Sequence, residues 1–81
     1  MRPLLRLFLF VEGVDMKLIV NGESTEILDN TTVAALLDSL GISRERVAVE
    51  VNLDIVRKVE YDTCILSEWD KVEIVHFVGG G

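Results

Sequence analysis

Residues 71–78 read KVEIVHFV, with β-branched and aromatic side chains at neighbouring as well as alternating positions. This pattern predicts a strand, and it is typical of a strand in the middle of a sheet, where both faces carry apolar residues. Residues 17–20, KLIV, show the same pattern near the other end of the chain. We therefore expect these two segments to be neighbouring central strands.

The segment after KLIV predicts a hairpin. Asn21 and Gly22 form the dipeptide most typical of a two-residue type I′ turn. Residues 24–28, STEIL, then place Thr25 and Ile27 between polar neighbours, as expected of a half-buried strand. The first two strands should therefore be antiparallel partners.

A short amphipathic helix should follow the hairpin. Asn30, Thr31 and Thr32 offer side-chain oxygens for an N-cap. Apolar residues then recur at helical spacing, and a glycine closes the pattern: Val33, Leu36, Leu37, Leu40 and Gly41.

The rest of the chain adds two further strands. VAVEV at 47–51 predicts a strand, and residues 52–54 predict a turn. The region near IVRKV at 55–59 predicts a short strand, whereas residues 60–70 are irregular. The order β, β, α, β, β, β predicts an α+β protein with the β-grasp, ubiquitin-like fold, a mixed sheet with one main crossover helix. The expected core beneath the helix is Leu18, Val20, Ile27, Val33, Leu36, Leu37, Leu40, Val49, Val51, Val72 and Ile74.

Alternation along the central strands sends three apolar residues to the face that the helix does not cover. These residues are Ile19, Val75 and Phe77. Apolar residues on an uncovered sheet face suggest a site for a protein partner.

Composition excludes several classes of function. The net charge of -6 disfavours binding to nucleic acid. The 81 residues contain no phosphate-binding glycine motif, no His/Cys set with metal spacing and no nucleophile-base arrangement, so we expect no intrinsic cofactor, no metal and no enzymatic activity. The single cysteine, Cys64, fits a reducing compartment, and we expect a cytoplasmic protein.

Residues 1–15 differ from the regular sequence that follows. Two arginines precede an apolar run at residues 7–11, which is shorter than the about 20 residues of a membrane span and lacks a cleavage pattern behind it. We interpret 1–15 as an N-terminal extension and 16–81 as the domain, with no membrane partner. We expect Met16 to be the functional start of the domain. The sequence leaves open whether the extension results from an upstream start, forms an extra edge strand or forms a weak amphipathic element.

The last three residues are Gly79, Gly80 and Gly81. Glycines contribute no side chain to a core, but they form a thin segment that reaches about 10 Å when extended. The α-carboxylate of Gly81 is ionised at neutral pH, and as a nucleophile it can attack the α-phosphate of ATP. The tail is therefore a candidate substrate for another protein's active site.

Five segments of the chain together point to one family. They are MKLIVNG at 16–22, TTVAALLDSLG at 31–41, VAVEVN at 47–52, DKVEIVHFV at 70–78 and the final GGG. Together they resemble the ThiS family, the sulfur carrier proteins of thiamine biosynthesis. The resemblance implies that Gly81 is adenylated and then converted to a thiocarboxylate, which donates sulfur for thiazole formation. It implies three partners: an E1-like adenylating enzyme that uses ATP and Mg, a thiazole synthase, and a sulfur-donor protein such as a cysteine desulfurase. It further implies that the partner binds Gly80, Gly79, Val78, Phe77 and Val75. We add Ile19 to these partner-binding residues because it lies on the uncovered sheet face.

Two alternatives remain open at this point. The small subunit of molybdopterin synthase resembles this chain in fold and tail chemistry, although it commonly has a proline near its glycines, which HFVGGG at 76–81 lacks. The second alternative is a ubiquitin-like interaction module whose tail is never activated. Removal of Gly81 should abolish the function of a carrier and leave an interaction module able to bind.

Overall fold

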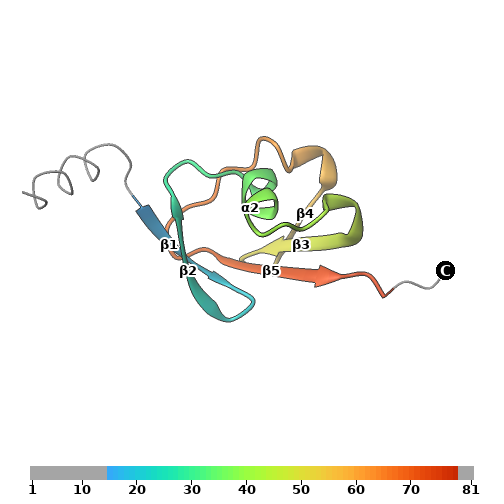
Figure 1. Cartoon of the computed structure of the whole chain (residues 1–81), viewed down its shortest axis with the longest axis horizontal. Coiled ribbons are helices and arrows are strands. Elements are labelled where there is room, and N and C mark those ends of the chain that lie inside the picture. The colour runs from blue at the N-terminus through green and yellow to red at the C-terminus, as the bar shows by residue number, and fades with distance from the viewer. Residues whose placement is uncertain (1–14, 79–81) are drawn as a thin grey trace, which may run out of the picture.

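The computed structural model describes residues 15–78, which form a mixed five-stranded sheet with a helix packed across it (Figure 1). Two short 3₁₀ helices, η1 and η2, lie in the connections. The elements are β1 (Asp15–Val20), β2 (Glu23–Leu28), α2 (Val33–Ser39), η1 (Arg44–Arg46), β3 (Val47–Val51), β4 (Asp54–Val56), η2 (Lys58–Glu60) and β5 (Lys71–His76).

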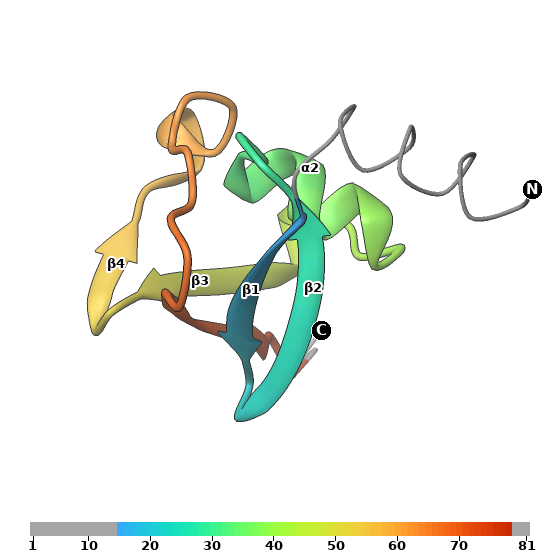
Figure 2. The ribbon, with the colours of Figure 1, turned by 90° about the vertical axis from the view of Figure 1, so that its left-hand side faces the viewer.

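The strand order is β2-β1-β5-β3-β4, so β5 is the central strand and β1 is its neighbour, as the sequence predicts. β1 and β5 run parallel, and the other pairs are antiparallel. Figure 2 shows α2 on one side of this sheet, and among residues 15–78 the other side has no helix over it. This arrangement is the β-grasp, and the predicted fold class is confirmed.

Both hairpins turn through two residues with positive φ angles. Asn21 (φ 47°) and Gly22 (φ 85°) join β1 to β2, as the NG dipeptide predicts. Asn52 (φ 52°) and Leu53 (φ 74°) join β3 to β4. The second turn is therefore shorter than expected, because Asp54 already pairs with β3 as the first residue of β4.

Helix α2 begins where the cap residues predict. The Thr32 side-chain oxygen accepts a hydrogen bond from the Ala35 N–H at 3.1 Å. The expected burial of Leu40 is wrong: its side chain is 43% exposed. The helix ends at Ser39, and Leu40 is the C-cap, so its side chain no longer follows the buried stripe.

The core lies between α2 and the helix-facing side of the sheet. Eight of the eleven predicted core residues are buried, whereas Ile27 and Val51 are half-buried against the core and Leu40 is outside it. Sequence reasoning missed six buried residues: Met16, Ala34, Val47, Val56, Tyr61 and Leu66.

Two predicted boundaries differ slightly from the structure. β1 begins at Asp15, one residue before the expected start of the domain. β5 ends at His76, two residues before the expected end of the last strand. Residues 1–14 and 79–81 lie outside the described part of the chain.

Candidate functional site

The candidate site is the end of β5, where the chain leaves the sheet toward its last residues. β5 pairs with β3 over five positions, from Val51↔Val72 to Val47↔His76. The ladder continues one residue further, because the Phe77 N–H donates to the Arg46 carbonyl at 2.9 Å. Val78 follows and is 95% exposed, so the last described residue stands clear of the core.

Phe77 is held at the surface by a cation as well as by its backbone. The Lys58 ammonium lies 5.2 Å from the centroid of the Phe77 ring, within the range of a cation–π contact. Phe77 and Val75 are each 56% exposed, although both are large apolar residues. The end of β5 therefore presents an apolar surface with a positive charge beside it.

The structure brings some of the predicted partner-binding residues together and separates another. Val75 of β5 pairs with Ala48 of β3, and Phe77, which continues the pairing with Arg46 just after β5, projects to the same face as Val75. Ile19 is half-buried and lies opposite Lys71, four residues or about 13 Å along the sheet from Val75. Gly79, Gly80 and Gly81 lie outside the described residues, so their predicted roles stay predictions.

Two asparagines that sequence reasoning treated only as turn residues fix the position of β5. The Asn21 side chain accepts from the Ile74 N–H at 2.7 Å and donates to the Ile74 carbonyl at 3.2 Å. The Asn52 side chain accepts from the Lys71 N–H at 2.9 Å, and the Asn52 N–H donates to the Lys71 carbonyl at 2.8 Å. Both turns thus bind the last strand. The feature of the sequence that could have indicated this is the asparagine at the first position of each turn.

The ionisable groups with shifted pKa values lie in or after the two 3₁₀ helices: Arg44 in η1, and Tyr61, Asp62 and Cys64 after η2. Arg44 forms two hydrogen bonds with Asp62, at 2.9 and 3.3 Å, and these lower the pKa of the Asp62 carboxyl. The Arg44 guanidinium also stacks 5.6 Å from the Tyr61 ring, whose burial raises the pKa of its hydroxyl. Burial, together with Glu60 and Asp70, raises the pKa of the Cys64 thiol, which fits a structural thiol.

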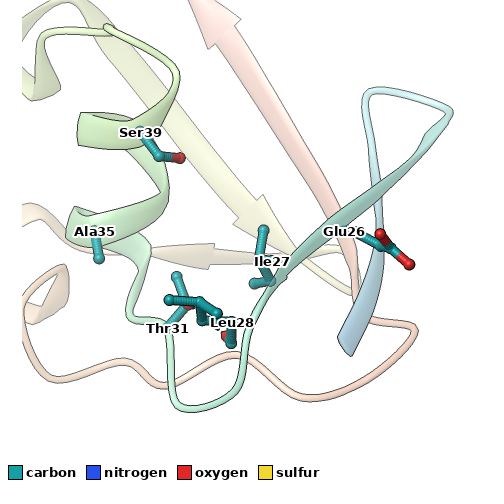
Figure 3. Close-up of a pocket in the computed structure, with 6 residues that line it drawn as sticks. All are labelled: Glu26, Ile27, Leu28, Thr31, Ala35 and Ser39. Carbon is teal, nitrogen blue, oxygen red and sulfur yellow. Dashed lines mark hydrogen bonds between the residues drawn. The ribbon is translucent and has the colours of Figure 1, made fainter. Parts of the chain in front are cut away.

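A pocket of about 290 Å³ lies between β2 and α2 (Figure 3). It is lined by Glu26, Ile27, Leu28, Thr31, Ala35 and Ser39, and the Glu26 carboxylate points away from the helix. The hydroxyls of Thr31 and Ser39 already donate to the backbone carbonyls of Leu28 and Leu36. The pocket therefore offers few free polar groups to a ligand, and we assign it none.

Residues 15–78 contain no group of three or more His, Cys, Asp or Glu side chains that could hold a metal ion. In the same range, no helix has the length and apolar character needed to cross a membrane.

The fold and this site define a small β-grasp protein whose central strand, β5, is followed by the exposed residues Phe77 and Val78. The model of the ThiS family matches residues 18–81, and the chain belongs to the ThiS family. Its structure resembles the crystal structure of the thiamine biosynthesis protein ThiS from Geobacter metallireducens, with a TM-score of 0.71 and 32% identity, covering 82% of this chain and 100% of that one.

Curated relatives give the same family and one further association. The sulfur carrier protein ThiS of Bacillus subtilis is 43% identical over 53 residues, which are 65% of this chain and 80% of that protein. A thiazole synthase of Paramagnetospirillum magneticum is 48% identical over 66 residues, or 82% of this chain. The chain spans only 20% of the length of that thiazole synthase, and the same share of a second one from Magnetococcus marinus.

Proposed function

We propose that this chain is a sulfur carrier of thiamine biosynthesis whose terminal residue, Gly81, carries the sulfur as a thiocarboxylate. The observation that carries the proposal is the path of β5, which is bonded on both sides at Lys71–Ile74 and then leads outward to an exposed Val78. Three residues beyond Val78 reach about 10 Å when extended, enough to enter the cleft of another protein. Membership of the ThiS family supports the same role.

The proposed chemistry starts at the carboxylate of Gly81. A carboxylate oxygen attacks the α-phosphorus of ATP, the bond to the β-phosphate breaks, and pyrophosphate leaves. The terminal sulfur of a persulfide on the donor protein then attacks the carbonyl of the acyl adenylate and expels AMP. A second thiol breaks the S–S bond of the resulting acyl disulfide, so that a disulfide forms and Gly81 leaves as the thiocarboxylate. Glycine suits both steps because it has no Cβ to obstruct the approach to the carbonyl.

The nucleotide and the catalytic groups would come from a partner. The pocket between β2 and α2 has no positive side chain in its lining, so it is not suited to a triphosphate. We therefore propose that an E1-like adenylating enzyme supplies ATP and Mg, and that a protein such as a cysteine desulfurase supplies the sulfur. Because the reaction consumes ATP, we place it in the cytoplasm.

We propose thiazole synthase as the acceptor of the sulfur. A region similar to this chain is part of two proteins that are named thiazole synthase. Two components that share one polypeptide are present in equal amounts and close together, as a carrier and its acceptor need to be. The partner would receive Gly81 while Val75, Phe77 and Val78 contact its surface.

Growth of a bacterial strain that lacks its own thiazole sulfur carrier tests this function. The full chain should restore growth without added thiazole, and the chain without Gly81 should not. A strain that lacks the small subunit of molybdopterin synthase is the control, and its molybdenum enzymes should stay inactive. Rescue of the control strain alone would transfer the assignment to molybdopterin synthesis, and rescue of the first strain by the chain without Gly81 would refute the carrier role.

A further inference from the structure

The two edges of β5 are bonded over different lengths. On the β3 side, pairing runs from Val72 through His76 and continues to Phe77. On the β1 side, pairing covers only Ile19↔Lys71 and Val20↔Val72, because β1 then turns away into its hairpin. The second half of β5 therefore has a neighbouring strand on one side only.

The Asn21 side chain takes the next place on the β1 side. Its amide bonds both the N–H and the carbonyl of Ile74, as a backbone peptide group in that position would. The Asn21 N–H itself donates to the Val72 carbonyl at 2.8 Å. Asn21 thus extends the ladder by one step, and the ladder ends there.

The next backbone groups of β5 face the open side. The Phe77 to Arg46 hydrogen bond shows that Val47↔His76 is a non-hydrogen-bonded pair, so the His76 N–H and carbonyl point away from β3. They point to the same side as the Ile74 groups that Asn21 binds, two residues earlier. Within residues 15–78, no hydrogen bond to His76 on this side is present.

We propose that this open edge, His76 to Val78, is a docking site for an extended peptide segment of the enzyme that activates the tail. The segment would pair with the His76 N–H and carbonyl and with the Val78 N–H, as an added strand of the sheet. The exposed side chains of Val75 and Phe77 would pack against its residues. The inference rests on the proposed function for the identity of the partner.

The position of the edge supports this occupant over a second copy of the chain. Gly81 is only three positions beyond Val78, so a protein that holds Gly81 in an active site lies within about 10 Å of the edge. A second copy would bring together two chains of net charge -6, which repel each other. The edge and the tail therefore serve the same partner.

Two substitutions at one position separate the backbone from the side chain. His76→Pro removes the N–H on the open edge and breaks no hydrogen bond among residues 15–78, and proline is tolerated on such edges. His76→Ala removes the imidazole and keeps the N–H. Val78→Pro removes the next edge N–H from a residue beyond the end of β5, so it tests the edge even if His76→Pro disturbs the fold.

The test is the affinity of each full-length variant for a purified E1-like adenylating enzyme of thiamine synthesis, measured by calorimetry, with circular dichroism as the check on folding. We expect His76→Pro and Val78→Pro to weaken binding at least tenfold, and His76→Ala to change it less than twofold. In the wild-type complex, exchange of the His76 amide should slow at least tenfold.

Each result bears on one of the two proposals. Wild-type affinity in both proline variants, or an equal loss in His76→Ala, would overturn strand addition and leave the carrier role intact. A wild-type chain that neither binds the enzyme nor supports its ATP-pyrophosphate exchange would overturn both. Self-association through the edge, seen as a concentration-dependent mass that the proline variants lose, would replace the partner with a second copy.

Discussion

The two halves of β5 contain similar apolar residues and use them in opposite ways. In the first half, Val72 and Ile74 are buried under α2, and both edges of the strand are bonded. In the second half, Val75 is 56% exposed, as is Phe77 just after the strand, and one edge is open. Apolar character alone therefore does not separate residues that stabilise the fold from residues that meet a partner. The two kinds of residue differ in their position: the stabilising residues face α2, and the exposed ones lie on the other face, beyond the hydrogen bonds of Asn21.

The largest expected contrast is between two adjacent residues of β5. Ile74→Ala should lower the free energy of unfolding by about 2–5 kcal/mol, because it leaves a cavity in the core. Val75→Ala should change it by less than about 0.5 kcal/mol, because Val75 is a surface residue. Urea denaturation of both variants measures the difference, and equal losses would mean that β5 has no such division.

The next effect should appear where the division begins. Asn21→Ala should cost about 1–3 kcal/mol, because alanine is strained at φ 47° and the two hydrogen bonds to Ile74 are lost. Asn21→Gly is the matched control, since glycine accepts that φ angle and loses only the side-chain bonds. Both variants should speed exchange of the Ile74 amide, and unchanged exchange in both would show that Asn21 does not fix the strand.

Phe77→Ala should have a smaller effect, and on binding rather than on stability. We expect affinity for the adenylating enzyme to fall about tenfold, because an exposed aromatic side chain beside Lys58 would be lost from the interface. Leu53→Ala is the control, since Leu53 is 85% exposed but lies at the β3–β4 turn. Equal affinities of the two variants would place the partner elsewhere.

The smallest effect concerns the surface ion pair between Arg44 and Asp62. Arg44 lowers the pKa of Asp62, so the pair stabilises the fold above the unfolded pKa of about 3.8 and loses this contribution as the pH falls through the lower folded pKa. Asp62→Asn should therefore be slightly less stable than the wild type at pH 7 and equally stable near pH 2. A stability gap that persists near pH 2 would point to another role for Asp62.

Much of the fold could be predicted from local patterns. The NG turn, the threonine cap and the two successive apolar runs each specify a local structure, and the strand order follows from them. Leu40 was misplaced because periodicity does not show that a helix ends one residue earlier. Tyr61 and Leu66 were missed because they lie in irregular segments, where burial depends on contacts with distant parts of the chain.

The candidate site was less accessible to sequence reasoning. Alternation placed Val75 and Phe77 on one face, as the structure has them. The bonds of Asn21 to Ile74 join residues 53 positions apart, and no local pattern reports such a contact. The open edge at His76 could not be found either, because it depends on where a neighbouring strand turns away.

The carrier role of Gly81 is the central claim, and the intact mass of the chain tests it most directly. The chain would be incubated with ATP, Mg, a sulfur donor and the adenylating enzyme, beside a chain that lacks Gly81. A mass gain equal to the replacement of oxygen by sulfur, confined to the complete chain, is the predicted result. An unchanged mass, with an enzyme that modifies another carrier under the same conditions, would contradict the claim.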